Sequence, residues 1–458
     1  MKFYNRKKEL DFFEKIKNSK DKKFIVLYGR RRIGKTTLIK KAFKNEYNSF
    51  YYFVEVKKEE TLLKELSLAF SKSIYMRWYD LFTELFEKYD YVIFDEFQNF
   101  YKINPEILYA FQHAWDDTEN NIKLIVLGSY VGMIKKIFME EKMPLFGRSD
   151  YFLKIKDFSL KDSLIMLKDF GYDIIESLEI YGMVGGIPKY LWLFKEKKDI
   201  KSLIYDIFID DFSPLREEAK NILISEFGSE HKSYFSILEA LAGGMKTTSE
   251  IKDISKIPQT SLPKYLNELS DIYEIISREK SLFSKKNKDI RYSIKDKFYN
   301  FFFYHIYRNY SLIEFFPEKA IKKIYNEFNT YMGFQFEEIC KTFIQENPQL
   351  FDFIPENIGK VWGRVPYKKN ESYDIDIVAY DENNILFGEC KWNNKKVDLS
   401  IYDKLKLRSE FVNYGNKNKK FVIFSKSGFA EDLLSLKDKN LFLLTPEDFW
   451  DYPKYCVN

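Results

Sequence analysis

The fold of the N-terminal part is decided by FIVLYGRRRIGKTT, residues 24–37. The first five residues are a short apolar run between lysines and a glycine, which predicts a buried parallel strand. Gly29–Thr36 then fits the pattern G-x-x-x-x-G-K-[ST], and Thr37–Lys44 is expected to be helical. A strand before such a turn and a helix after it confirm a phosphate-binding loop (P-loop). The sequence therefore predicts a nucleotide site here.

The residue types of the P-loop suit the binding of ATP with Mg²⁺. Its glycines let backbone N–H groups turn inward around the phosphates, and the following helix adds the positive end of its dipole. Lys35 is expected to reach the β- and γ-phosphates, and the Thr36 hydroxyl to coordinate Mg²⁺. A degenerate loop kept only for folding is the alternative, and the intact Lys35 and Thr36 argue against it. The predicted nucleotide-contacting residues are Gly29, Arg30, Arg31, Arg32, Ile33, Gly34, Lys35, Thr36, Thr37, Asp95 and Ser129.

Two carboxylates follow the apolar run Tyr91–Phe94, which predicts another buried strand. Asp95 would hold Mg²⁺ together with Thr36, in the manner of a Walker B aspartate. Glu96 would orient or deprotonate the attacking water as the catalytic base. Two acids at a strand end are weak evidence alone, but after a P-loop they indicate ATP hydrolysis.

Two further polar residues follow the predicted strand Leu124–Leu127. Ser129 would touch the attacking water or the γ-phosphate, or it would cap the next helix, and the sequence does not choose between these roles. Arg148 lies on a later loop, where an arginine can stabilise transition-state charge in cis or from a neighbouring subunit. The alternative for Arg148 is a surface salt bridge.

Five regions are expected along the 458 residues, which indicates a multidomain α/β chain. Apolar runs separated by helix-length segments predict a parallel sheet with helices on both faces in the first region. Helical periodicity follows, and then three short helices and two strands, the pattern of a winged helix-turn-helix. The predicted regions are a P-loop ATPase core at 1–155, a helical lid at 156–230, a winged helix at 231–297, a helical connector at 298–330 and a small α/β domain at 331–458.

The winged helix is a candidate DNA-binding surface. A basic wing suits phosphate contacts, and the third helix, with Gln259, Thr260, Ser261 and Lys264 near its start, could face a groove. Winged helices also bind proteins, and the sequence does not decide between the two partners. The expected elements are helices Tyr234–Ala242, Thr248–Asp253 and Thr260–Ser270 and strands Tyr273–Arg278 and Ile290–Ile294. The wing and its flanks hold the basic residues Arg278, Lys280, Lys285, Lys286, Lys288, Arg291, Lys295 and Lys297 against the acids Glu279, Asp289 and Asp296.

A second acidic constellation lies in the C-terminal domain. Asp376 falls on one predicted strand, and Glu389 and Lys391 fall on the next, after a turn at Asp381–Asn384. In an antiparallel hairpin the two carboxylates can approach on one face, and strand alternation places Lys391 beside Glu389. Asp376 and Glu389 would bind Mg²⁺, and Lys391 would position or activate water beside a scissile phosphate.

The N-terminal half resembles the archaeal-type ATPases of the AAA+/STAND class. The resemblance implies that Asn5–Leu10 lies near the adenine, with structural or nucleotide-adjacent roles for Arg6 and Glu9. It also places the Gly-Gly-Ile-Pro segment in a helical lid, where the chain departs from other AAA+ proteins because Lys189, and no arginine, stands near the second sensor position. The segments that carry the resemblance are Phe3–Leu10, Tyr28–Thr37, Phe94–Phe97, Gly128-Ser129, Leu145–Arg148 and Gly185–Tyr190.

Residues 331–458 resemble the PD-(D/E)xK, restriction-endonuclease-like superfamily through Asp376, Glu389 and Lys391. The resemblance implies a nuclease-like α/β fold, and the same domain is found appended to the archaeal ATPases named above. Glu337 stands where many such nucleases carry an additional acid, although it also fits a plain helix-surface glutamate. Asp374 either shares the face of Asp376 or is a loop acid. An inactive nuclease fold used for binding is the alternative.

Composition limits the partners of the chain. A net charge of +5 does not by itself indicate a nucleic-acid-binding protein, so any DNA-binding surface must be a local basic patch. The few separated cysteines and histidines suggest neither a disulfide framework nor a zinc site. No apolar run approaches the roughly 18 residues that span a bilayer, so we expect no membrane partner and a cytoplasmic location.

The leading hypothesis from the sequence is an ATP-driven switch that gates or positions a DNA-directed nuclease, with ATP, Mg²⁺ and DNA as partners. One alternative is an ATP-dependent regulator that binds DNA or a protein through the winged helix. Another is a signalling scaffold that forms nucleotide-dependent homo-oligomers.

Overall fold

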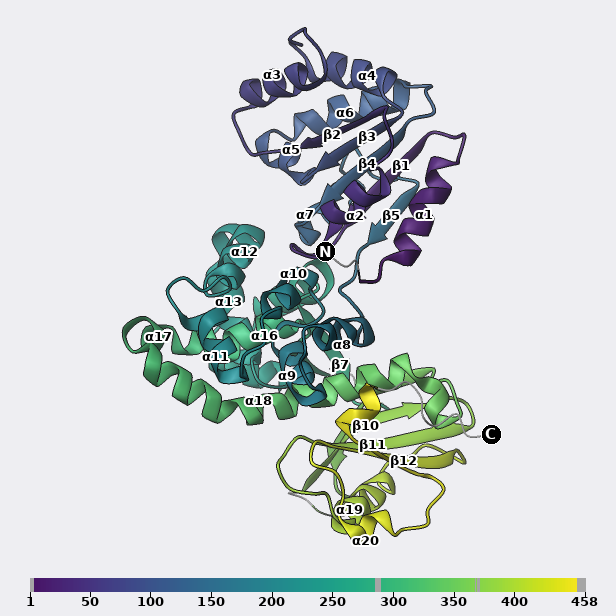
Figure 1. Cartoon of the computed structure of the whole chain (residues 1–458), viewed down its shortest axis with the longest axis vertical. Helices are drawn as coiled ribbons and strands as arrows, with labels where there is room; N and C mark the ends of the chain where they lie inside the picture. Colours follow the sequence, from purple (N-terminus) through teal and green to yellow (C-terminus); the bar gives the residue numbers. More distant parts are fainter. Residues whose placement is uncertain (1–3, 285–289, 367, 369–370, 451–458) are drawn as a thin grey trace. The chain divides into compact units, whose positions relative to one another are not determined.

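The computed structural model describes residues 4–284, 290–366, 368 and 371–450 (Figure 1). They form two compact units. The first comprises Met1–Asp157 with Ile187–Lys189, and the second comprises Phe158–Gly186 with Tyr190–Asn458. Within the described ranges, no helix is both long and apolar enough to cross a membrane.

A five-stranded parallel sheet forms the centre of the first unit, in the order β2-β3-β4-β1-β5. The predicted parallel sheet is therefore confirmed. Because β4 lies between β1 and β3 and all three strands are parallel, the residues that follow these strands meet at one edge of the sheet. The strands are β1 (Lys23–Tyr28), β2 (Ser49–Phe53), β3 (Tyr91–Asp95), β4 (Lys123–Gly128) and β5 (Tyr151–Lys154).

Helices cover both faces of this sheet, as the sequence predicts (Figure 1). One face packs against α1 (Lys7–Lys17) and α2 (Lys35–Ala42). The other face has an aromatic core in which Phe82 and Phe111 meet edge to face at 4.9 Å. The helices over that face are α3 (Glu59–Phe70), α4 (Trp78–Lys88), α5 (Gln98–Ile103), α6 (Glu106–Asp117) and α7 (Val131–Met139).

The second unit begins as a set of helices that leads into a small antiparallel sheet, β6-β8-β7. The strands are β6 (Lys246–Thr247), β7 (Ile276–Lys280) and β8 (Ile290–Ile294), and β7 with β8 makes the expected two-stranded ribbon. The helices are α8 (Leu160–Asp169), α9 (Ile174–Val184), α11 (Ile200–Ile204), α12 (Glu218–Phe227), α13 (His231–Leu241), α14 (Thr248–Ser255), α15 (Leu262–Asn267), α16 (Lys297–Phe301), α17 (Tyr310–Phe315) and α18 (Pro317–Glu346), and the short helix α10 (Pro188–Leu191) is divided between the two units.

Two helices begin at other residues than predicted. The third helix of the ribbon region, α15, begins at Leu262, because Pro258 and the turn at Gln259–Ser261 precede it. The helix expected at 333–346 is the second half of α18, which begins at Pro317 and runs through residues 330 and 331 without a break. Apolar residues continue along one side of α18 from Ile321 to Ile344, so one buried stripe holds the whole helix.

The C-terminal part of the second unit is a mixed five-stranded sheet in the order β13-β12-β11-β10-β9. β9, β10 and β11 are antiparallel, whereas β11, β12 and β13 are parallel. One face packs against α19 (Leu399–Ser409) through Tyr402 and Leu405. The strands are β9 (Asn357–Arg364), β10 (Ser372–Tyr380), β11 (Asn384–Lys391), β12 (Asn418–Ser425) and β13 (Leu441–Leu444), and a short helix, α20 (Glu431–Leu434), precedes β13.

Candidate functional site

The P-loop joins the end of β1 to the start of α2, as its motif requires. Gly29 has a φ of 156°, and a Cβ there would lie 2.5 Å from the Ile155 carbonyl oxygen. Gly34 has a φ of 92° and lies immediately before α2. Both positions therefore need glycine, one for a close backbone approach and one for a left-handed turn.

Lys35 is buried inside the loop, with only 5% of its surface exposed. Its Nζ donates hydrogen bonds to the carbonyl oxygens of Gly29 at 2.8 Å and Arg30 at 2.9 Å. These bonds place the ammonium group within the turn that cradles phosphates in P-loop proteins. The other residues of the loop are more open: Arg31 and Thr37 are exposed, and Arg30 and Arg32 are partly buried.

Thr36 and Asp95 meet below the P-loop. The Thr36 hydroxyl donates to Asp95 Oδ2 at 2.6 Å, which joins the start of α2 to the end of β3. Tyr51, on β2, donates its hydroxyl to the same oxygen at 2.8 Å. Burial and the charge of Asp95 raise the pKa of Tyr51, so it remains a hydrogen-bond donor. A hydroxyl and a carboxylate at this distance fit a Mg²⁺ ion that also contacts ATP phosphates.

Glu96 projects from the edge of the sheet in a left-handed conformation, with a φ of 56°. Its Oε1 accepts a hydrogen bond from Ser129 Oγ at 2.6 Å, and its other oxygen accepts one from Gln98 Nε2. Ser129 follows β4, so the hydrogen bond spans two neighbouring strand ends. Two donors, Ser129 and Gln98, thus hold the Glu96 carboxylate in one orientation.

Arg6 lies against the P-loop from the N-terminal segment. Its guanidinium donates to the Ile33 carbonyl oxygen at 3.2 Å and to Glu9 Oε1 at 3.0 Å. Arg6 is buried and has a φ of 78°. The two residues that the resemblance singles out therefore form one ion pair that contacts the loop.

Arg148 is far from the P-loop of its own chain, so the structure does not favour a role in cis, which is one of the two alternatives that the sequence leaves open. β5 runs parallel to β1, with Tyr151 opposite Ile25, so Arg148 lies at the edge where β1 begins. The P-loop is at the other end of β1, about 16 Å away at roughly 3.3 Å per residue. The Arg148 guanidinium pairs with Asp116 at 3.0 Å, the surface salt bridge that was the alternative. A contribution to a neighbouring subunit stays a prediction.

The second acidic constellation is organised by a β-bulge in β10. Ile375 pairs with Val361 and Val378 pairs with Gly359, so two residues, Asp376 and Ile377, face the single residue Lys360 on β9. On the other side, the pairing of β10 with β11 ends at Ile377 and Gly388. Asp376 and Glu389 are the next residues on their strands, as the predicted hairpin requires.

Hydrogen bonds and ion pairs hold the two carboxylates. Asp376 Oδ2 accepts a hydrogen bond from the Cys390 backbone N–H at 2.9 Å. Glu389 is buried, and its two oxygens contact Lys391 Nζ at 2.5 Å and the Arg408 guanidinium of α19 at 3.4 Å. Burial and the charge of Asp376 raise the pKa of Glu389, although Lys391 opposes the shift. Burial likewise raises the pKa of Asp376.

Glu337 of α18 joins this site through an ion pair with Lys360. Burial raises the pKa of Glu337 to about 7, Lys360 opposes the shift, and the charge of Asp376 adds to it. Glu337 is therefore no plain surface glutamate. Asp374 is exposed and lies on β10 opposite Trp362.

The fit of the second site to a metal ion rests on Asp376 and Glu389. Glu389 is buried and Asp376 is half-buried, burial raises the pKa of both carboxyl groups, and a divalent cation would stabilise their charged forms. Across the described part of the chain, no group of three or more His, Cys, Asp or Glu side chains is arranged to hold a metal ion. The donors thus suit an ion that also takes water or phosphate oxygens as ligands.

The basic residues of the ribbon region have diverse partners. Lys264 pairs with Glu230 at 3.3 Å, and Arg291 stacks on Trp362 of β9 with 4.5 Å between the guanidinium carbon and the ring centre. Lys297 donates to Gln335 of α18 at 3.4 Å. The wing residues Lys285, Lys286, Lys288 and Asp289 lie outside the described residues.

Sequence reasoning missed four residues that contact the predicted ones: Tyr51, Gln98, Lys360 and Arg408. Each comes from an element distant in sequence or has no motif of its own. The only available signal is the position of Arg408 on the helix that follows β11.

Two family profiles match the chain. Residues 3–194 match an ATPase domain predominantly from Archaea. Residues 302–401 match archaeal and bacterial proteins of unknown function.

Known proteins and solved structures add further similarities. The chain is 54% identical over 44 residues to the uncharacterized ATP-binding protein MJ0423 of Methanocaldococcus jannaschii, which is 10% of this chain and 75% of that protein. The solved ORC2 protein of Aeropyrum pernix, in ADPNP–ADP complexes, is 15% identical with a TM-score of 0.47, over 70% of this chain and 95% of the other. Domain III of the Thermotoga maritima replication initiation protein DnaA is 13% identical with a TM-score of 0.31, over 44% and 92%. Scores this low do not establish a shared fold.

One relative extends over the whole chain. The uncharacterized protein MJECL04 of Methanocaldococcus jannaschii is 35% identical over 471 residues, which cover 98% of this chain and 100% of the relative. The chain therefore belongs to the family of MJECL04 and carries an archaeal-type ATPase domain at its N-terminal end.

Proposed function

We propose that the first unit hydrolyses ATP with Mg²⁺ in the manner of an AAA+/STAND ATPase. The observation that supports this most strongly is the 2.6 Å hydrogen bond from Thr36 to Asp95, beside a P-loop with a buried Lys35. Thr36 and Asp95 would hold Mg²⁺, which would neutralise phosphate charge. Lys35 would bind the β- and γ-phosphates.

In this proposal Glu96 is the catalytic base. It accepts the proton of the attacking water, and the hydrogen bonds from Ser129 and Gln98 hold its carboxylate toward that water. Ser129 thus acts as a positioning residue. Arg6 supports the loop through the Ile33 carbonyl.

We further propose that the C-terminal sheet is a nuclease-like domain that cuts DNA, and that the nucleotide state of the first unit gates it. The supporting observation is the position of Asp376 and Glu389 where β10 and β11 stop pairing, with Lys391 2.5 Å from Glu389. The carboxylates would hold a divalent cation, and Lys391 would position water beside a phosphate. The winged helix would contribute DNA affinity, and nucleotide binding would control homo-oligomer formation.

A regulatory role without cleavage is the second candidate function. Glu389 is bound by Lys391 and Arg408, and Glu337 is bound by Lys360, so protein cations already neutralise this site. Such neutralisation suits an inactive nuclease fold that binds DNA or a partner protein in response to ATP.

DNA cleavage with Mg²⁺ or Mn²⁺ distinguishes the two functions. Linear, supercoiled and single-stranded DNA are incubated with wild type, Asp376→Asn, Lys391→Ala and Lys35→Ala, with and without ATP. Asp374→Asn, two residues away and exposed, is the matched control for Asp376→Asn. Cleavage that is lost only with Asp376→Asn and Lys391→Ala supports the nuclease, and its dependence on Lys35 supports gating. ATP hydrolysis without cleavage of any DNA leaves the regulator.

A further inference from the structure

The end of the β7–β8 ribbon lies against the C-terminal sheet. We call residues 279–283, which are the last two residues of β7 and the three that follow, the ribbon tip. Ser281 Oγ donates to the Trp362 carbonyl oxygen and accepts from the Trp362 N–H, both at 2.9 Å. Phe283 packs on Tyr380 with ring centres 4.8 Å apart. The tip therefore binds the C-terminal sheet through both backbone and side chains.

The first link from the tip to the acidic site runs through β9. The Leu282 N–H donates to the carbonyl oxygen of Lys360 at 3.0 Å. The side chain of Leu282 covers Gly359, where a Cβ would meet it at 3.3 Å. The ribbon tip thus fixes the backbone of the residue whose side chain binds Glu337.

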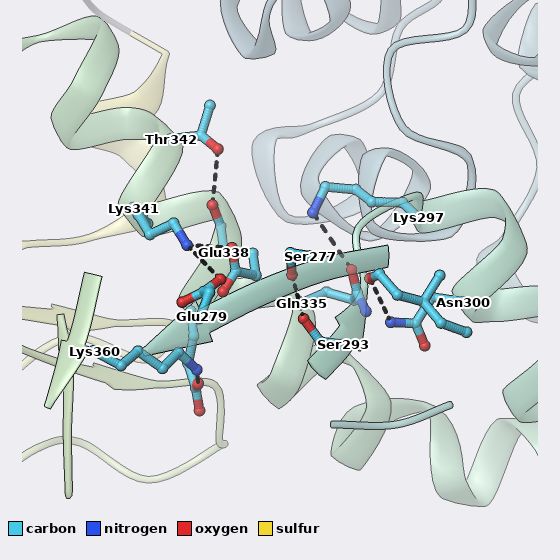
Figure 2. Close-up of polar contacts among 12 residues, drawn as sticks. Ser277, Glu279, Ser293, Lys297, Asn300, Gln335, Glu338, Lys341, Thr342 and Lys360 are labelled. Atoms are coloured by element: carbon cyan, nitrogen blue, oxygen red, sulfur yellow. Dashed lines mark hydrogen bonds and ion pairs between the residues drawn. The ribbon is translucent and has the colours of Figure 1, made fainter. Parts of the chain in front are cut away.

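A second link runs through α18. Lys341 lies between Glu279 of the tip, at 3.2 Å, and Glu338, at 3.0 Å, as Figure 2 shows. The Glu279 and Lys341 side chains are 19% and 16% exposed, so solvent screens this pair only in part. Burial alone would lower the pKa of Lys341, but Glu338 and Glu279 raise it. Lys341 is four residues after Glu337, one helical turn along the same side of α18.

The two links join the ribbon tip to the two elements that carry the ion pair of Glu337 and Lys360. One holds the strand that carries Lys360, and the other holds the helix that carries Glu337. A 2.7 Å hydrogen bond between the hydroxyls of Ser277 and Ser293 joins the two ribbon strands (Figure 2). The tip therefore extends from two strands that are held together.

We propose that Glu279 of the ribbon is a positioning residue for the Asp376–Glu389 site, because it fixes α18 and, with the rest of the tip, sets the place of Glu337 and Lys360. The inference rests on the proposed nuclease function. In this proposal, Asp376 and Glu389 take up their metal-binding geometry only while the ribbon tip contacts β9 and α18. Outer groups that orient metal ligands typically change metal affinity about 10–100-fold. Glu279 acts through Lys341 and α18, so we expect about tenfold weaker Mn²⁺ binding when its charge is removed.

The test compares Glu279→Gln with Glu230→Gln in the full chain without nucleotide. Glu230 pairs with Lys264 of α15 at 3.3 Å, and among the described residues no hydrogen bond or ion pair joins Glu230 to the C-terminal sheet. Mn²⁺ affinity is measured by titration calorimetry, with Asp376→Asn identifying the relevant site. Hydrogen exchange of 357–364 and 334–341 reports on β9 and α18 independently of metal. In DNA cleavage, the Mn²⁺ concentration for half-maximal rate should rise while the KM for DNA stays unchanged.

A pair test adds a readout that general destabilisation would not produce. Lys341→Gln and the double variant with Glu279→Gln should show non-additive losses of Mn²⁺ affinity, because the two side chains act through one contact. Glu279→Asp, which keeps the charge, should recover part of the affinity.

Each outcome judges a different claim. Unchanged Mn²⁺ affinity and unchanged exchange in Glu279→Gln overturn the positioning role and leave the nuclease proposal intact. A wild-type protein that neither binds Mn²⁺ at Asp376 nor cuts DNA overturns the nuclease proposal, and hydrogen exchange then decides whether Glu279 fixes β9 and α18. Equal effects of Glu279→Gln and Glu230→Gln also overturn the inference.

Discussion

Glu179 gives the second unit a pH-dependent stability that can be calculated. It lies on α9 with its side chain 14% exposed, and Lys426 Nζ is 3.8 Å from its Oε1. Burial raises the pKa of Glu179 from 4.5 to about 7, Lys426 opposes this shift, and the nearby Asp173 and Glu176 add to it. The folded protein therefore favours the neutral carboxyl group.

The sign and size follow from linkage between protonation and folding. Because the pKa is higher in the folded than in the unfolded chain, the contribution to stability is fully present below a pH of about 4.5 and is lost as the pH rises through about 7. The loss is about 1 kcal/mol near pH 5 and about 3 kcal/mol near pH 7, at roughly 1.4 kcal/mol per pKa unit. Between these pH values, Glu179 should lower the free energy of unfolding by about 2 kcal/mol.

Glu179→Gln removes this titration and keeps the shape of the side chain. The assay is hydrogen exchange of the α9 peptide 174–184, converted to opening free energies between about pH 5 and pH 8. Lys426 stays charged throughout this pH range. The loss of its partner therefore changes the opening free energy of the variant by the same amount at every pH and does not change the slope of that free energy against pH. The wild type should lose about 2 kcal/mol relative to the variant between pH 5 and 7. Parallel curves for the two proteins would refute the reasoning.

Four further predictions concern the ATP site and are tested by steady-state ATP hydrolysis and nucleotide titration. Glu96→Gln should slow hydrolysis about 10²–10⁴-fold at nearly unchanged ATP affinity, and weaker ATP binding of similar size would contradict its role as the base. Ser129→Ala should slow hydrolysis about tenfold, because one charge-assisted hydrogen bond to Glu96 is lost, and an unchanged rate would assign Ser129 to helix capping alone. Tyr51→Phe should weaken Mg²⁺-dependent ATP binding up to about tenfold, and no effect would show that the bond to the aspartate is dispensable. Arg148→Ala should leave ATP turnover of the monomer unchanged and lower the free energy of unfolding by less than about 1 kcal/mol. A loss of turnover that appears only at high protein concentration would instead indicate that Arg148 acts at the ATP site of a neighbouring subunit.

The P-loop could be predicted from sequence because its signals are local. The apolar strand, the two glycines with fixed backbone requirements and the helix start lie within 14 consecutive residues. Asp95 and Glu96 were predictable for the same reason, since a parallel sheet brings strand ends to one edge. The same rule applies to Arg148, because a residue before β5 lies at the opposite edge of the sheet.

The groups that orient these residues could not be predicted. Tyr51 is 44 residues from Asp95, and Lys360 is 23 residues from Glu337, so only the tertiary structure brings them together. No local pattern reports such contacts. β9 was also missed, since Asn357–Arg364 contains two glycines and little apolar alternation. The continuity of α18 was also missed, although one apolar stripe runs along the whole helix.

The bulge in β10 also has a consequence for how this strand can vary. Ile375 and Val378 both point into the core beneath α19 although they are three positions apart, which regular alternation forbids. The extra residue thus changes the phase of the strand midway, and Asp376 lies at that change. Deleting one residue here would restore an ideal strand and keep the core register on both sides. A variant in which Asp376 is deleted to make β10 regular would therefore keep the fold and lose the acidic site.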